Sequence, residues 1–240
     1  MNKSILKVTE ARWRQAQQFE LHVWRQQSRW YRILMSRVLK LLHLKDFEFG
    51  DDWNRWWYEQ FDGYKVVPRD IDQAVELGCG PYTNMRLVLE NRTIRKVICS
   101  DPLAEQYLKM NGWLSSAYRK QLIEVDSNPA EECPYENESC DLVLLINVLD
   151  HVQDAIVVLD NVFRILKPGA FFVFGQDLTD EIDMNNTEED VGHPIRIHHD
   201  ELDRWIADNF DVKMRKVLSR EVGRNPEAHY GTFLFIGQKR

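Results

Sequence analysis

The feature that most constrains this chain is a change of rhythm after Pro68, where short apolar runs begin to alternate with stretches of helical periodicity. Helices are expected at about Leu103–Asn111 and from an Asp154 N-cap to Leu166. The runs expected to be strands are Ala74–Leu77, Lys96–Ser100, Leu122–Val125, Asp141–Ile146 and Ala170–Phe174. This alternation predicts an α/β fold, a doubly wound and mainly parallel sheet with helices on both faces.

The end of the chain departs from that alternation. A helix is expected at Asp200–Phe210, followed by two strands, Asp211–Leu218 and Gly231–Gly237, joined by a polar loop. Such a pair predicts an antiparallel finish to the sheet. At 240 residues the chain suits one sheet domain, residues 70–240, preceded by an extension, residues 1–69.

The extension differs from the rest of the chain in charge and in tryptophan content. Residues 1–45 hold ten Lys or Arg against two Glu, although the whole chain has a net charge of -7. Six of the eight Trp lie in the first 57 residues, and apolar positions spaced by three and four predict an amphipathic helix from Val23 to Leu42. We expect this arm to be a lid over a site or a dimer-forming helix, with plain packing on its own domain as the alternative.

Several classes of protein are disfavoured. No apolar run reaches the length of a bilayer span, and the first residues lack a signal-peptide pattern, so a cytoplasmic location is expected. The four cysteines form no CxxC pair, which disfavours a zinc site or a disulfide framework. The acidic body would repel phosphate, so nucleic acid is not an expected partner.

The sharpest motif is AVELGCGPYT, residues 74–83, in which a strand leads through two glycines toward a helix. Gly78 and Gly80 allow a tight turn and a close approach of a ligand to the backbone. Glu76 would repel a pyrophosphate in this loop but can anchor the ammonium group of an amino-acid-like ligand. Two further carboxylates end the next strands: Asp101 is suited to ribose hydroxyls and Asp126 to an adenine amino group.

These segments resemble the class I S-adenosylmethionine-dependent methyltransferases, over about residues 70–240. The resemblance rests on VELGCG, on CSDP at residues 99–102 and on the long segment Cys140–Gly175, with its LDHV loop and LKPG helix end. It implies a Rossmann-like seven-stranded sheet with an antiparallel last strand. It also implies S-adenosylmethionine as cofactor and S-adenosylhomocysteine as product.

The resemblance assigns cofactor-binding roles to seven residues. Glu76, Gly78 and Gly80 would hold the methionine part and Asp101 the ribose. Pro102 would face the adenine ring, Asp126 would bind its edge, and the backbone carbonyl of Asn147 would accept from the amino group.

This sequence departs from the family pattern in two places. Tyr82 stands where the family usually has a small residue, and it would pack over the cofactor or into the sheet. The segment between Val125 and Cys140 is long, so the adenine role could pass from Asp126 to Glu131. The Asn-Pro-Pro-Tyr-like box of the amino-methylating nucleic-acid branch is absent after the fourth strand, which disfavours that branch.

His151 is the candidate catalytic base, because it follows the fourth strand on the loop that faces the cofactor in the family. Asp150 beside it would orient the imidazole or bind substrate. The alternative is a structural histidine at the start of a helix.

A second cluster, GHPIRIHHDEL at residues 192–202, supplies His193, Arg196 and His198 as candidate acceptor-binding residues. The spacing of its histidines does not match a helix-face metal site, so no metal is expected. The loop Asp177–Asp190 carries seven acids and is expected to be a solvated loop or a lid that attracts a cationic acceptor.

Together these observations predict methyl transfer to a small molecule. The favoured acceptor group is a hydroxyl of a sugar, a glycan precursor or a natural product. An amine, a nucleic acid or a protein as acceptor, or a catalytically silent partner subunit, remain the alternatives.

Overall fold

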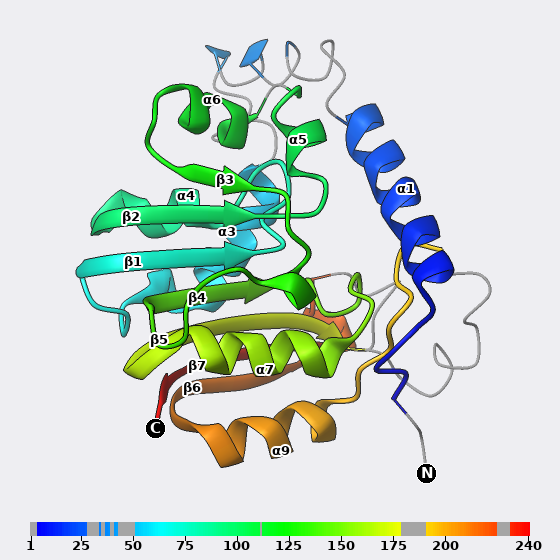
Figure 1. The fold of residues 1–240 in the computed structure, drawn as a ribbon. Helices are drawn as coiled ribbons and strands as arrows, with labels where there is room; N and C mark the ends of the chain where they lie inside the picture. The colour runs from blue at the N-terminus through cyan, green and yellow to red at the C-terminus, as the bar shows by residue number, and fades with distance from the viewer. Residues whose placement is uncertain are drawn as a thin grey trace.

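The computed structural model describes residues 4–27, 34, 37–38, 41–42, 51–110, 112–178, 191–224 and 231–240. Its centre is a seven-stranded sheet in the order β3-β2-β1-β4-β5-β7-β6. The strands are β1 (Asp70–Leu77), β2 (Thr93–Ser100), β3 (Glu124–Asp126), β4 (Cys140–Ile146), β5 (Leu166–Leu178), β6 (Phe210–Ser219) and β7 (Gly231–Lys239). Neighbouring strands from β3 to β5 pair in parallel, whereas β7 is antiparallel to both β5 and β6. The expected parallel sheet with an antiparallel finish is therefore confirmed (Figure 1).

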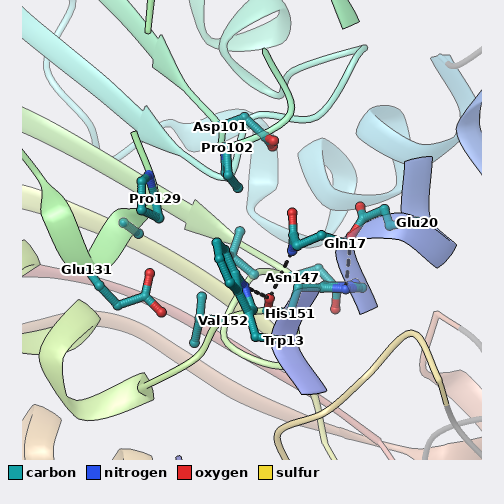
Figure 2. Close-up of a pocket in the computed structure, with 13 residues that line it drawn as sticks. Trp13, Gln17, Glu20, Asp101, Pro102, Pro129, Glu131, Asn147, His151 and Val152 are labelled. Carbon is teal, nitrogen blue, oxygen red and sulfur yellow. Dashed lines mark hydrogen bonds and ion pairs between the residues drawn. The ribbon is translucent and has the colours of Figure 1, made fainter. Parts of the chain in front are cut away.

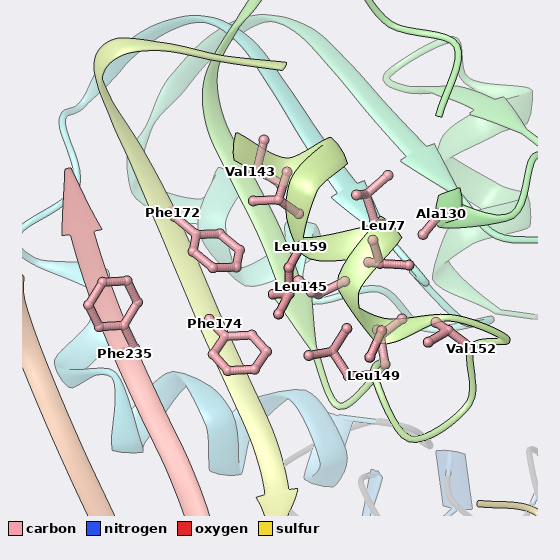
Figure 3. Packing of buried hydrophobic residues seen from close by; sticks show 14 of the residues in the cluster. Leu77, Ala130, Val143, Leu145, Leu149, Val152, Leu159, Phe172, Phe174 and Phe235 are labelled. Carbon is pink, nitrogen blue, oxygen red and sulfur yellow. The ribbon is translucent and has the colours of Figure 1, made fainter. Parts of the chain in front are cut away.

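Helices cover both faces of this sheet. On one face, α7 (Ala155–Ile165) and α9 (His199–Asn209) bury their apolar sides in a core cluster that includes Phe172 and Phe174. Figure 3 shows the rings of these two residues directed into that cluster, with Phe235 of the neighbouring strand beside them. The other face is covered by α3 (Asp51–Gln60), α4 (Met85–Val88), α5 (Ala104–Tyr107) and α6 (Trp113–Arg119).

Strand β5 illustrates why the central strands read as unbroken apolar runs. Its residues alternate between the two clusters: Phe172 and Phe174 face α7 and α9, whereas Phe171 and Val173 face the opposite layer. A strand covered on both faces has no water-facing side, so it needs apolar residues at every position.

Short 3-10 helices complete the connections, namely η1 (Asp62–Tyr64), η2 (Leu89–Asn91), η3 (Ala130–Glu132) and η4 (Arg220–Val222). The expected N-cap of α7 is present, since the Asp154 side chain accepts from the amide of Val157. All four cysteines are free and buried. Among the helices of the described ranges, none combines the length and apolar character that a bilayer crossing requires.

Two expected helices differ from the structure. The one expected at Leu103–Asn111 is reduced to the single turn of α5, and Gly112 is the N-cap residue of the next helix, α6. In the extension, α1 (Glu10–Gln27) begins well before Val23. Most of residues 28–42, where that helix was expected to continue, and most of the acidic loop 177–190 lie outside the described residues.

The described part of the extension packs on the sheet domain. Before α1, Ile5 and Lys7 form antiparallel bridges with Arg196 and Asp154. Helix α1 then stands across the ends of the strands at which the arrowheads of β1, β2 and β4 point (Figure 1). Because carboxyl ends of parallel strands are where α/β sheets bind ligands, α1 covers the edge where a site is expected.

Candidate active site

The loop after β1 is shaped by its two glycines. Gly78 and Gly80 have positive φ values of 68° and 57°. A Cβ at Gly78 would lie 2.5 Å from Cγ2 of Val148, whereas one at Gly80 would meet nothing within 4 Å. Gly78 is thus required by backbone conformation and by packing, and Gly80 leaves an open cradle.

Glu76 holds the segment that follows this loop. Its Oε1 accepts from the backbone and side-chain amides of Asn84, and its Oε2 accepts from the amide of Met85 and the hydroxyl of Thr83. Burial raises the pKa of Glu76, and these hydrogen bonds oppose the rise. In this structure the carboxylate stabilises the start of α4. Its anchoring of a ligand ammonium group stays a prediction.

Asp101 follows β2 and reaches back to the glycine loop. Its Oδ2 accepts from the amide of Gly80 at 3.0 Å, and its Oδ1 from the amide of Leu103 at 2.8 Å. Burial, and next the negative charge of Glu20, raise the pKa of Asp101 to about 7. A buried carboxyl with two oxygens beside a glycine cradle can accept from the hydroxyls of a ribose.

Two adjoining cavities lie at this edge of the sheet, and five residues line both: Glu20, Gly78, Asp101, Asn147 and His151. The smaller one, called the slot, has a volume of about 50 Å³ and lies among Trp13, Pro102, Pro129 and Val152 (Figure 2). The larger one, called the main cavity, has a volume of about 290 Å³ and extends along the glycine loop toward Trp57 and His193.

The slot bears on the choice between Asp126 and Glu131. Glu131 lines it, with its Oε1 accepting from the amides of Gln153 and Asp154. Asp126 lines neither cavity among the described residues, and its oxygens accept from Ser100, Asn128 and Tyr135. Of the two carboxylates expected near an adenine edge, the structure therefore brings only Glu131 to the slot.

Helix α1 is attached to the loop that follows β4. Trp13 Nε1 and Gln17 Nε2 both donate to the backbone carbonyl of His151, at 3.1 Å and 3.2 Å (Figure 2). On the same helix, Trp24 packs its ring at 5.6 Å from that of Tyr82. Tyr82 is buried, so it packs against α1 over the glycine loop.

The His151 ring is held from both sides. Its Nδ1 lies 3.1 Å from a carboxylate oxygen of Glu20 and 3.1 Å from the carbonyl oxygen of Gly192. Both neighbours are acceptors, so Nδ1 carries the proton that they share. The other nitrogen, Nε2, lies 3.7 Å from Oδ1 of Asp150, which is buried.

His193 joins this group from the loop before α9. Its Nε2 lies 4.0 Å from Oδ2 of Asp150, and its ring is 4.7 Å from that of His151. Asp150, His151 and His193 thus offer atoms within 4.8 Å of one another, a grouping that can suit a metal ion and that spacing in the sequence did not predict. The expectation of no metal stays a prediction.

The remaining candidate residues lie elsewhere. Arg196 is buried in the bridge with Ile5. His198 caps α9 through its side chain, and its amide donates to Ser4. Neither lines the slot or the main cavity among the described residues, and their acceptor-binding roles stay predictions.

The site also contains residues that sequence analysis did not single out: Trp13, Gln17, Glu20, Trp57 and Arg224. Arg224 bonds to buried Asp177 and lies over the ring of Trp57 at 5.7 Å. The high tryptophan content of the extension could have indicated that it contributes to the site, but it does not predict which side chains line the cavities.

Part of the sequence matches a family model and a curated relative. Residues 75–174, from the glycine loop to β5, match the family model described as a methyltransferase domain. A curated relative, an uncharacterized 37.1 kDa protein of transposon TN4556 from Streptomyces fradiae, is 26% identical over 145 residues, which are 56% of this chain. The chain spans only 40% of the length of that relative.

Solved structures share the fold at low sequence identity. The N-methyltransferase NodS from Bradyrhizobium japonicum, solved with S-adenosyl-l-homocysteine, has a TM-score of 0.57 and 13% identity, over 82% of this chain and 90% of that one. The 1,6-didemethyltoxoflavin-N1-methyltransferase from Burkholderia thailandensis, solved with its substrate and S-adenosylhomocysteine, has a TM-score of 0.56 and 16% identity, over 78% and 77%.

Proposed function

We propose, from the premise that residues 75–174 form a class I S-adenosylmethionine-dependent methyltransferase domain, that this chain methylates a hydroxyl of a small molecule. The proposed acceptor is a sugar, a glycan precursor or a natural product. The comparisons confirm four expectations from the sequence: the family, the fold, the enzyme class and the cofactor. The acceptor is what the proposal adds.

The residues present fit the cofactor. The open cradle at Gly80 admits a ligand against the backbone, and the Asp101 carboxyl lies beside it. The cofactor carries positive charge on its sulfonium and ammonium groups, and Glu20 and Asp101 line both cavities. When bound, S-adenosylmethionine supplies an electrophilic methyl group, whose bond to sulfur breaks as the bond to the acceptor oxygen forms.

One observation carries the choice of a hydroxyl acceptor, namely the fixed orientation of His151. Acceptors on both sides hold the proton on Nδ1, so Nε2 is the nitrogen left to accept a proton, and His151 lines the main cavity. A hydroxyl is a weak nucleophile and must lose its proton during transfer, whereas a neutral amine needs no base to attack. His151 would take that proton.

Helix α1 supports the same proposal by covering the site. Trp13 and Gln17 attach it to the His151 carbonyl, and Trp13 and Glu20 form part of the cavity walls. Excluding water strengthens the electrostatic interactions within a site and favours a defined approach of the acceptor. In this proposal residues 1–69 act as the lid of the domain formed by residues 70–240.

An amine acceptor is the second candidate. Glu20 lines both cavities and Asp150 lies against His151, so negative charge near the cavities would attract an ammonium group. The two solved neighbours named above are N-methyltransferases, but their identity to this chain supports only a common fold. Dimerisation, cytoplasmic location and the absence of nucleic-acid partners stay predictions.

The test is a methylation assay with matched acceptor panels. The purified chain is incubated with S-adenosylmethionine and with hydroxyl compounds or amines of comparable size, and products are identified by mass spectrometry. We expect a gain of one methyl group on a hydroxyl, with equimolar S-adenosylhomocysteine. His151→Gln should reduce kcat on the order of a hundredfold while S-adenosylhomocysteine still binds. Methylation of amines alone would contradict the proposal.

A further inference from the structure

We propose that Glu20, on helix α1, is a positioning residue for His151, so that the site is complete only when α1 is docked on the sheet domain. The inference rests on the proposed function, in which His151 accepts the hydroxyl proton. It adds a residue from the extension to the machinery of the domain that the family model covers.

The Glu20 carboxylate is fixed at both oxygens. Trp24, four residues later on the same helix, donates its indole N–H to Oε1 at 3.0 Å. The other oxygen, Oε2, lies 3.1 Å from Nδ1 of His151. The side chains of Glu20 and His151 are only 22% and 19% exposed, so their interaction is shielded from solvent. A line of contacts thus runs from Trp24 through Glu20 to the imidazole.

The charge of Glu20 suits this role. Burial alone would raise the pKa of Glu20, but the contact with His151 and the indole hydrogen bond outweigh it, and the pKa is lowered. Glu20 is therefore ionised at neutral pH. Because the interaction is reciprocal, the carboxylate stabilises the imidazolium that forms when Nε2 takes a proton.

Other ionisable groups also face this pair. Asp150 follows β4 and His193 precedes α9, and both lie against the imidazole. Asp101, at the end of β2, interacts with Glu20 through charge. Proton binding is shared within such a group, so the effect of Glu20 must be measured by its removal.

A role limited to docking the helix does not need this geometry. Trp13 and Gln17 already attach α1 to the backbone carbonyl of His151. Glu20 instead reaches the ring nitrogen opposite the one that faces Asp150. The carboxylate acts on the imidazole itself, and its loss should change catalysis more than it changes folding or ligand binding.

The test compares Glu20→Gln and Glu20→Ala with the control Glu10→Gln. Glu10 is an exposed residue at the start of the same helix, where it pairs with Arg14. Glutamine can still accept from Nδ1 but carries no charge, whereas alanine removes both functions. Affinity is measured with S-adenosylhomocysteine, which lacks the sulfonium charge, so that the measurement does not include the attraction between that charge and the carboxylate of Glu20.

We expect Glu20→Gln to lower kcat about tenfold and Glu20→Ala about a hundredfold, with acceptor KM and the Kd of S-adenosylhomocysteine within about threefold of wild type. The acid limb of the pH–rate profile should move to lower pH in both variants. Glu10→Gln should match the wild type in every measurement. Equal kcat in all four proteins, or a loss explained wholly by weaker binding, would overturn the proposal.

A measurement without methyl transfer separates this inference from the proposed function. Nitrogen-15 NMR of labelled histidine reports which ring nitrogen of His151 carries the proton and follows its titration. We expect the proton on Nδ1, and a titration midpoint lower by about one pH unit in Glu20→Gln, a tenfold change in proton affinity. A proton on Nε2, or an unchanged midpoint, would overturn the role of Glu20 even in an active enzyme.

A metal ion bound by Asp150, His151 and His193 would also overturn the proposed role of Glu20. If chelation abolished activity and Zn²⁺ restored it, Nε2 of His151 would be a ligand together with Asp150 and His193, and could not accept the proton. Full activity after chelation is the expected result.

Discussion

Asp101 combines a proposed binding role with an energetic cost. Its two oxygens accept backbone amides from the loops after β1 and β2, which prepares them for further donors. The same burial raises its pKa to about 7 from an ordinary value of 3.8. Between those values the folded protein keeps a proton that the unfolded chain releases, so stability falls as pH rises across that window.

This pH dependence can be tested with Asp101→Asn. Asparagine does not ionise, so the free energy of unfolding should decline less between about pH 4 and pH 7 in the variant. The difference between the two slopes, integrated over the window, should be on the order of 4 kcal/mol. The measurement is urea unfolding at a series of pH values, with exposed Asp208→Asn as the control.

The asparagine also places an amide group beside two N–H donors, which lowers stability by a similar amount at every pH. The slope and not the absolute stability is therefore the readout. Parallel pH profiles for the wild type and Asp101→Asn would contradict the assigned pKa.

At the scale of elements, the junction between β1 and its loop depends on Gly78. The positive φ of this residue and its contact with Val148 act together, because the strand must turn sharply against the loop after β4. The loop after β4 brings Asn147 and His151 to the cavities. A local conformation thus fixes the relation between the glycine loop and His151.

Gly78→Ala should therefore destabilise the protein by more than backbone strain alone. Gly169 is a matched control, since its φ is 76° and nothing lies within 4 Å of an added Cβ. We expect Gly169→Ala to cost about 1 kcal/mol and Gly78→Ala about 1–3 kcal/mol more, because a methyl group there collides with Val148. Chemical denaturation measures both, and equal losses would show that the loop relaxes around the methyl group.

At the scale of the whole molecule, α1 joins segments that are far apart in the chain. Trp13 is 138 positions from His151, to which it donates, and Arg12 donates to the carbonyl of Val191. Trp13 and Gln17 line the slot, so we expect α1 to loosen when ligands of the slot enter or leave. Ligand contacts with Trp13 and Gln17 would then favour the docked helix.

Hydrogen exchange tests this coupling. S-adenosylhomocysteine should slow exchange of the amides in Glu10–Gln27 several-fold, because ligand binding and helix docking stabilise each other. The amides of α9, whose residues line neither the slot nor the main cavity, should change little and serve as the internal control. Slower exchange confined to the loops after β1 and β2 would show that α1 is not a lid.

The sequence by itself determined the sheet and the residues at its strand ends. Alternating apolar runs and helix signals are local patterns, and the burial of each strand on two faces follows from them. For the same reason Gly78, Gly80, Asp101 and Asn147 could be predicted to meet at one edge, since the carboxyl ends of parallel strands gather there.

Only the tertiary structure decided what lies over that edge. The apolar face of α1 says that the helix must pack, but not on which surface, since any complementary apolar surface satisfies the hydrophobic effect. The contact of Glu20 with His151, the choice of Glu131 over Asp126 at the slot, and the approach of His193 to Asp150 all join distant parts of the chain. Such contacts depend on how whole elements pack, and no local pattern contains that information.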